Sequence, residues 1–172
     1  ITLELVRRAA AGGVEVREHV DALELDADTL VLATGAASAG LGSKLGVDLP
    51  VRPLVRQLVE TAPVPGITRD LPLTIESESG VHFRRRGEAL VLAMPEAETR
   101  WGSEETVDDA LVEDWVSRVA YRYPRAAGVP VARAWAGLYD MTPDAHPIIG
   151  HVADGLYAAC GFSGHGFMQS PA

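Results

Sequence analysis

The sequence predicts an α/β fold that carries an inserted α+β region. The chain opens with the order helix, glycine turn and strand, which is typical of the second half of a βαβ unit. A continuous apolar run at residues 29–33 is typical of a parallel strand that is buried on both faces. After Val47 short strand segments are joined by glycine-containing turns, and this pattern predicts an antiparallel sheet.

The first part alternates between helix and strand. Residues 2–11 predict a helix that a pair of glycines ends, and residues 14–17 predict a short strand. The apolar strand at 29–33 is followed by a predicted helix at 38–45.

The middle region predicts four strands and one helix. The strands lie at residues 51–60, 73–75, 81–85 and 90–94. An amphipathic helix is predicted from an N-cap at Thr106 to a stop at Pro124, because apolar residues recur every four positions between them.

The last part predicts two strands, at 131–139 and 156–159, and an Asp-Gly hairpin turn precedes the second. Between them, residues 140–150 carry two prolines and predict a rigid connector. A glycine-rich loop at 161–166 leads into a helix that begins at Phe167.

The composition is that of a globular protein and argues against several functions. Of the 172 residues, 47% are hydrophobic and 23% are charged, and the formal net charge is −9. We expect neither nucleic acid nor an anionic membrane as a partner, because both attract basic surfaces. The single cysteine, Cys160, excludes an internal disulfide. With no signal segment at the start, it predicts a reducing, cytoplasmic location. Because the chain starts at Ile1 without Met and stops inside a patterned segment, we expect a fragment or a processed chain.

Three segments are candidates for ligand binding. The loop at 161–166 frees backbone N–H groups to point at an anion beside a helix start. The strand that ends in Thr34 and Gly35 places backbone at the carboxyl edge of a sheet, where ligands bind. From the spacing alone, an ordinary turn remains an alternative interpretation of both segments. For residues 140–150, a plain connector is the default interpretation.

Other chemistries fit the sequence less well. Ser163 does not sit in a G-x-S-x-G elbow, because the second glycine is misplaced, so a hydrolase is disfavoured. The five histidines show no metal-ligand spacing, and we expect no metal site. The arginines at 84–86 are typical of a solvated turn, with carboxylate binding as a second interpretation.

Six short segments, in this order, carry a resemblance to a known family. They are VLATGA at 31–36, PVRP at 50–53 with Gln57, WAGLY at 135–139, MTPD at 141–144, PIIG at 147–150 and GFSGHGFM at 161–168. Together they resemble the FAD-dependent amine oxidoreductases related to D-amino-acid oxidase, with sarcosine oxidase, glycine oxidase and dimethylglycine dehydrogenase as the nearest branch. The resemblance covers nearly the whole chain and is most specific from residue 133 to residue 171.

The resemblance implies a partial Rossmann-like FAD domain at 1–46 and 135–172, interrupted by an antiparallel substrate domain at 47–134. It implies non-covalent FAD against three segments, whose residues are Ala33, Thr34, Gly35, Ala36, Asp144, Gly161, Phe162, Ser163, Gly164, His165, Gly166, Phe167 and Met168. It also places Tyr139 on the substrate side. We add two predictions from the residues themselves: the Arg52 guanidinium suits a substrate carboxylate, and His165, flanked by glycines, is free to approach the cofactor.

The sequence also departs from the family pattern. The GxGxxG fingerprint and the acidic ribose ligand that follows it are missing, and the stretch between Val16 and Asp28 is short. Gly137 stands where monomeric sarcosine oxidases attach flavin through Cys, so we expect no covalent link. Met168 stands where they carry Lys. Because a lysine-assisted reaction with oxygen is therefore not expected, an electron acceptor other than oxygen is an alternative.

The leading hypothesis is hydride transfer to FAD from the carbon that bears the nitrogen of an amine or amino acid, of the sarcosine, glycine or N-methyl amino acid class. The resulting imine then hydrolyses in water. The alternative is a catalytically silent fragment or packing module that does not bind FAD by itself. A partner chain or an oligomer fits either hypothesis.

Overall fold

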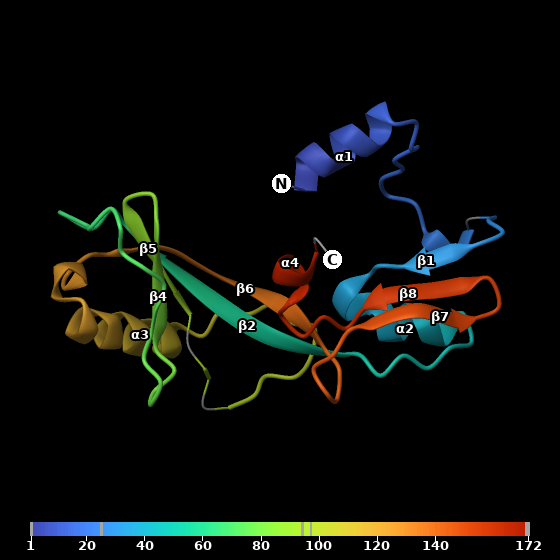
Figure 1. Ribbon diagram of the computed structural model, residues 1–172. Helices are drawn as coiled ribbons and strands as arrows, with labels where there is room; N and C mark the ends of the chain where they lie inside the picture. The colour runs from blue at the N-terminus through green and yellow to red at the C-terminus, as the bar shows by residue number, and fades with distance from the viewer. Residues whose placement is uncertain (1, 25, 94, 97, 171–172) are drawn as a thin grey trace. The chain divides into compact units, whose positions relative to one another are not determined.

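The computed structural model describes residues 2–24, 26–93, 95–96 and 98–170. Its internal contacts divide the chain into two units, residues 1–30 and residues 31–172 (Figure 1). The first unit holds helix α1 (Thr2–Ala11), as predicted, and a 3₁₀ helix, η1 (Ala22–Glu24). The strand predicted at 14–17 is wrong: this stretch is irregular and pairs with none of the described strands, which leaves Val14 and Val16 exposed.

A three-stranded sheet has the order β1-β8-β7, where β1 is Leu30–Leu32, β8 is Leu156–Cys160 and β7 is Ile148–Ala153. β7 and β8 form the antiparallel hairpin that the Asp-Gly turn predicted, with Ile149 opposite Ala159. The connector predicted at 140–150 is therefore too long, because its last residues pair with β8 as a strand. β1 is followed by the 3₁₀ helix η2 (Gly35–Ala37) and helix α2 (Ser38–Lys44).

A five-stranded sheet has the order β3-β4-β5-β2-β6, and each pair of neighbouring strands in it is antiparallel, as predicted. Its strands are β2 (Arg52–Thr61), β3 (Thr74–Ile75), β4 (His82–Arg86), β5 (Ala89–Ala93) and β6 (Val131–Met141). Met94, the predicted end of β5, lies outside the described residues. The three-part domain division stays a prediction, and β6 runs across its second boundary.

Helix α3 (Asp109–Arg122) covers the core of this sheet. Its N-cap is Asp108 and not the predicted Thr106, because the Asp108 carboxylate accepts the free N–H groups of Ala110 and Leu111. Trp115 and Val119 are buried, as the four-residue periodicity predicted, whereas Val112 is buried in place of Leu111, which is half-buried. They pack with apolar residues of β2, β4 and β5, such as Val59, Phe83 and Leu92.

The long pair β2–β6 determines which side chains share a face near the candidate site. Its register runs from Arg52 opposite Met141 through Leu54 opposite Tyr139 to Arg56 opposite Gly137. Because side chains alternate along a strand, these residues lie on one face of the sheet. In Figure 1 the two strands extend from the region of α3 towards the three-stranded sheet, and η2 packs against both of them.

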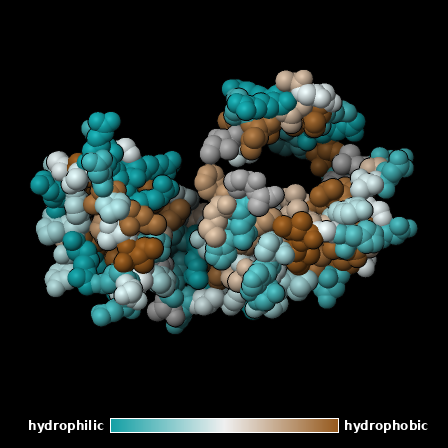
Figure 2. Space-filling view, in the orientation of Figure 1, coloured by the Kyte–Doolittle hydropathy of each residue, from teal (hydrophilic) through white to brown (hydrophobic). Residues whose placement is uncertain are grey.

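Hydrophobic side chains gather over the three-stranded sheet on the face seen in Figure 2. Large apolar residues that are exposed on its strands include Val31, Ile149 and Tyr157. None of the described helices has the length and apolar character needed to cross a bilayer.

Candidate active site

Asp140, at the end of β6, holds the glycine-rich loop in place. Its Oδ2 atom accepts hydrogen bonds from the backbone N–H of Gly161 (2.7 Å) and of Phe162 (3.1 Å). Its backbone carbonyl accepts a third, from the N–H of Ser163 (3.0 Å). The loop and the strand end therefore form one rigid piece, although 21 residues separate Asp140 from Gly161.

Hydrogen bonds between Thr142 and Ser163 also join the end of β6 to the glycine-rich loop, in the interior of the protein. Both are buried, and the Thr142 N–H donates to Ser163 Oγ over 3.1 Å. Thr142 Oγ1 donates to the carbonyl of His146 over 2.8 Å, so it also holds the connector loop. Ser163 has φ +52°, and its hydroxyl is engaged within this junction, which is a structural role.

The outer part of the loop exposes backbone donors. Gly164 and His165 are exposed, and a short helix, α4 (Gly166–Gln169), follows them. Among the residues that the structure describes, none accepts a hydrogen bond from the N–H of Gly164 or Gly166, whereas the N–H of His165 donates to the Phe162 carbonyl. These two N–H groups are available to a ligand.

The turn after β1 lies beside the same strand pair. Thr34 Oγ1 is 2.9 Å from the hydroxyl of Ser38, which is fully buried. Gly35 has φ +52° with open space on its Cβ side, so a ligand can approach its backbone closely. Burial raises the pKa of the Cys160 thiol at the end of β8, and a hydrogen bond with Ser38 partly offsets this rise.

Asp144 lies in the exposed connector loop, and no hydrogen bond or ion pair joins its side chain to the glycine-rich loop among the described residues. Its carboxylate accepts a hydrogen bond from the backbone N–H of His146 over 3.1 Å. This bond is the main reason why the pKa of Asp144 is lowered.

A cavity of about 340 Å³ opens on the face shared by β2 and β6. Its lining residues are Arg56, Gln57, Leu58, His82, Ala93, Pro95, Trp135, Gly137, Leu138 and Tyr139. Tyr139 also lies against Gly164, because a Cβ atom built on that glycine would be 2.6 Å from Tyr139 Cε2. One ring therefore joins the cavity to the glycine-rich loop.

Arg52 does not line this cavity. Its guanidinium lies 4.3 Å from the centroid of the Trp101 ring, and the residue is exposed. Arg56, four residues later on the same face, lines the cavity instead. The strand pattern places Arg52 and Arg56 on the same face and does not show which one a neighbouring segment covers, so it could not distinguish Arg56 as the residue that lines the cavity.

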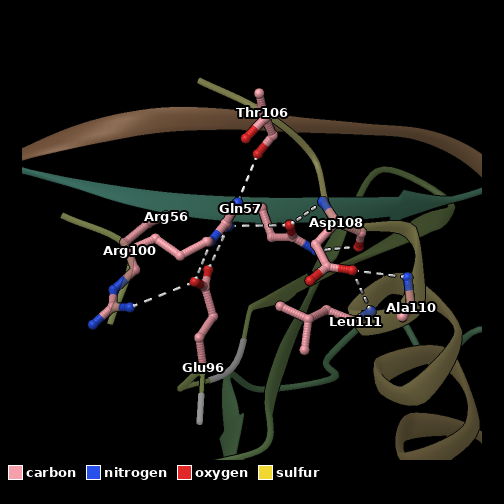
Figure 3. A network of polar contacts seen from close by, with 8 residues as sticks. All are labelled: Arg56, Gln57, Glu96, Arg100, Thr106, Asp108, Ala110 and Leu111. Carbon is pink, nitrogen blue, oxygen red and sulfur yellow. Dashed lines mark hydrogen bonds and ion pairs between the residues drawn. The ribbon is translucent and has the colours of Figure 1, made fainter. Parts of the chain in front are cut away.

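Arg56 lies beside a network of polar side chains, in which it contacts Glu96 (Figure 3). Glu96, whose side chain is only 2% exposed, accepts hydrogen bonds from Arg100 Nε at Oε2 (2.7 Å) and from Arg100 Nη2 at Oε1 (2.9 Å). Arg100 Nη2 also donates to Gln57 Oε1, which accepts the N–H of Asp108 as well. The hydrogen bonds to Glu96 raise the pKa of Arg100 further, so this guanidinium stays charged. No motif signals this network, because it joins segments far apart in the sequence.

The structure therefore brings three predicted segments to one region: the turn after β1, the end of β6 with Tyr139, and the loop at 161–166. Arg52 is paired with Met141 at the end of β6, but its guanidinium lies on the Trp101 ring. The hydrogen bonds of the Asp144 carboxylate stay within the connector loop. The roles predicted for these residues, including that of His165, stay predictions.

Comparisons with known proteins show the family to which the chain belongs. The family model described as FAD dependent oxidoreductase (DAO) matches residues 1–172. An FAD-dependent oxidoreductase domain-containing protein 1 of Xenopus laevis is 31% identical over 178 residues, which cover 92% of this chain and 36% of that protein. A glycine oxidase of Pseudomonas putida is 28% identical, with 93% of this chain and 42% of that protein covered.

Solved structures give the same result. A glycine oxidase from Geobacillus kaustophilus superposes with a TM-score of 0.73 at 25% identity, covering 86% of this chain and 39% of that one. L-proline dehydrogenase from P. horikoshii superposes with a TM-score of 0.72 at 25% identity, covering 83% and 39%. The chain thus spans 36% and 42% of the length of the two curated relatives named above.

Proposed function

Because the chain belongs to the DAO family of FAD-dependent oxidoreductases, we propose that it forms part of an enzyme that oxidises the C–N bond of an amine or amino acid. The names of its relatives support this class, since they include glycine oxidase, D-amino acid dehydrogenase and L-proline dehydrogenase. The observation that carries the proposal is the contact between Tyr139, which lines the cavity, and Gly164, whose backbone donor is open.

The residues present fit FAD, the cofactor of the family. The N–H groups of Gly164 and Gly166 have no acceptor among the described residues. They belong to a loop whose first residues are hydrogen-bonded to the Asp140 carboxylate. Donors held in this way stabilise negative charge on a ligand oxygen without having to reorient. The backbone at Thr34 and Gly35 would hold a further part of the same cofactor. FAD, when bound, supplies the acceptor for the hydride that leaves the substrate carbon.

The substrate would lie in the cavity beside Tyr139. The mixture of apolar walls with a few polar groups, including Arg56 and His82, is typical of a site for a small organic molecule. Small amino acids of the glycine, sarcosine or N-methyl class are the substrates we propose. The Tyr139 hydroxyl and ring orient the substrate against the loop.

The test uses the full-length protein that contains this chain. We expect a yellow preparation whose flavin absorbance bleaches on anaerobic mixing with glycine, sarcosine or proline. Tyr139→Phe should change kcat or KM for the amine and leave flavin content unchanged, while Tyr121→Phe, on the exposed face of α3, should change neither. A colourless protein that takes up no FAD would favour the silent packing module instead.

A further inference from the structure

We propose that His82 is a catalytic residue whose imidazole accepts the proton that the substrate ammonium group loses before its C–N bond is oxidised. This inference rests on the proposed function and deepens it, because it assigns the proton transfer of the same reaction to a residue of the same cavity.

The reaction itself requires a base. When a hydride leaves the substrate carbon, the lone pair of the nitrogen must form the C=N bond, and an ammonium group has no lone pair. In the step we assign, Nε2 of the neutral His82 ring takes one proton from the ammonium group. The substrate N–H bond breaks, its electron pair stays on the substrate nitrogen, and an Nε2–H bond forms. FAD accepts the hydride, and the imidazolium later releases its proton to water.

His82 lies on β4, on the side of the sheet that carries the cavity. It is half-buried and stands opposite Ala93 of β5, while Leu58 of β2 stands opposite Trp135 of β6. All four residues line the cavity together with Tyr139. The sheet therefore presents the imidazole to the space in which we place the substrate.

A hydrogen bond determines which ring nitrogen of His82 can accept a proton. Its Nδ1 atom is 2.9 Å from the carbonyl oxygen of Gly80. Because a carbonyl only accepts, Nδ1 carries the hydrogen of this bond, and Nε2 of the neutral ring keeps a free lone pair. No residue in the described part of the chain forms a hydrogen bond with Nε2, which leaves this atom for a ligand in the cavity.

The turn that contains Gly80 is held in one conformation. The Gly80 N–H donates to the Glu76 carbonyl over 2.8 Å, and the Glu76 N–H donates to the Val81 carbonyl over 2.8 Å. Gly80 also packs against Pro95, since a Cβ atom built on the glycine would overlap the proline ring. The carbonyl that orients the imidazole is therefore fixed, as the positioning of a catalytic base requires.

The other polar side chains of the cavity do not compete for the proton. A guanidinium has no lone pair to offer, and a phenol is protonated at neutral pH, so Arg56 and Tyr139 are donors. The Gln57 amide is not a base, and its oxygen already accepts two hydrogen bonds. Among the residues that line the cavity, His82 alone is a base at neutral pH.

The charged groups that adjoin His82 along β4 and after β3 and β5 are Arg84, Glu76 and Glu96. Arg84 is exposed and lies outside the cavity. Glu76 is paired with Arg122, and Glu96 is paired with Arg100. Neither carboxylate is left to accept the proton in place of the imidazole.

The experiment follows flavin reduction by an amine in the full-length protein, as a function of pH. The amine is whichever of glycine, sarcosine and proline bleaches the flavin fastest on anaerobic mixing. At about pH 7 we expect His82→Gln to slow the reduction about 100-fold or more, the usual effect of removing a general base. The rate should recover as the pH rises towards about 10, where an alkylammonium group loses its proton unaided.

Two further variants separate chemistry from structure. His82→Ala should regain part of its rate when free imidazole is added, because the small base occupies the space of the lost ring. His151→Gln removes an exposed histidine of β7 and should keep the wild-type rate and pH profile. Flavin content and thermal unfolding show whether each variant is folded, and if one His82 variant unfolds, the other decides.

A measurement without turnover tests the tautomer. Long-range proton–nitrogen NMR spectra of the full-length protein, labelled with nitrogen-15 in its histidine rings, should show Nδ1 of the neutral His82 ring protonated and Nε2 free. The loss of this signal in His82→Gln assigns it.

The proposal is overturned if wild type and His82→Gln share one pH profile, if imidazole leaves the rate of His82→Ala unchanged, or if the spectrum shows the opposite tautomer. A flavin that no amine reduces contradicts the proposed function, and this proposal falls with it. A flavin that the amine reduces equally well without His82 contradicts this proposal alone.

Discussion

Gly164 lies against the ring of Tyr139 so closely that a Cβ atom on the glycine would be 2.6 Å from Tyr139 Cε2. The backbone of Gly164 also has φ +86°, a conformation that residues with side chains rarely adopt. We expect Gly164→Ala to lower the free energy of unfolding by about 1–3 kcal/mol through backbone strain, with a further loss from the displaced ring.

Two controls separate these causes, with urea unfolding as the measurement. Gly87→Ala carries backbone strain alone, since φ is +63° and nothing lies within 4 Å of its Cβ position. In a Tyr139→Ala background the ring is gone, so Gly164→Ala should cost less there than in the wild type. An equal cost in both backgrounds would contradict the predicted clash.

The two hydrogen bonds that the Asp140 carboxylate accepts from the glycine-rich loop give a second prediction. Asp140→Ala leaves the N–H groups of Gly161 and Phe162 without their acceptor, and we expect a loss of about 1–3 kcal/mol for each group that stays unpaired. Asp140→Asn keeps a carbonyl oxygen that accepts both bonds, so its loss should be clearly smaller. Chemical unfolding of both variants is the measurement, and equal losses would show that the charge and not the acceptor matters.

Part of this structure could be predicted from the sequence because its determinants are local. The four-residue spacing of Val107, Leu111, Trp115 and Val119 predicted α3, and the Asp-Gly turn predicted the β7–β8 hairpin. The motif order predicted the FAD-dependent family, which the match over residues 1–172 confirms. Each of these signals lies within a short stretch of the sequence or in the order of such stretches.

The remaining features depend on contacts between distant segments. Residues 14–17 have strand composition but no pairing partner among the described strands, so the pattern alone did not make them a strand. Arg52 and Arg56 share one face of β2, and only the positions of Trp101 and the cavity show which of them is available. The sequence carries no local sign of either contact.

The buried ion pair behind Arg56 leads to a third prediction. Arg100→Met leaves the Glu96 carboxylate, 2% exposed, without the two hydrogen bonds that compensate its burial. We expect a loss of about 3–5 kcal/mol in unfolding free energy. Arg118→Met breaks an ion pair with Asp114 in which both side chains are about half exposed, and it should cost less than about 1 kcal/mol.

A second substitution checks the cause. In Arg100→Met, the further change Glu96→Gln removes the buried charge that has lost its two hydrogen bonds and should recover part of the lost stability. Equilibrium urea unfolding of wild type, Arg118→Met, Arg100→Met and the double variant gives the comparison. No recovery in the double variant would show that lost packing of the arginine explains the whole effect.

The buried thiol of Cys160 predicts a dependence on pH. Burial raises its pKa in the folded chain, so the unfolded chain, with an ordinary pKa of about 8.5, releases the proton first as the pH rises. The contribution of the thiol to stability is therefore complete below about pH 8.5 and falls as the pH rises through the folded pKa. Wild type should lose stability relative to Cys160→Ala as the pH rises above about 8.5. A stability difference that stays constant over this range would contradict the prediction.

The same burial should protect Cys160 from thiol reagents. We expect slow labelling by a neutral alkylating agent in the native chain and fast labelling in urea, because only the unfolded thiol is accessible and able to ionise. Rapid native labelling would show that β8 opens locally.

The last prediction concerns the cofactor and the isolated chain. The 172 residues contain no GxGxxG segment, the motif that places a pyrophosphate at a helix N-terminus and supplies much of the affinity for a dinucleotide. The open donors of Gly164 and Gly166 are predicted to contact only the flavin ring. The isolated chain should therefore bind FAD weakly or not at all, and riboflavin, which lacks the pyrophosphate and adenosine, equally weakly. Flavin fluorescence during titration measures both affinities, and Gly164→Val should lower both, because its side chain fills the space beside Tyr139 that the loop backbone needs. Submicromolar binding of FAD with a clear preference over riboflavin would contradict the prediction, since it would require a pyrophosphate site within these 172 residues.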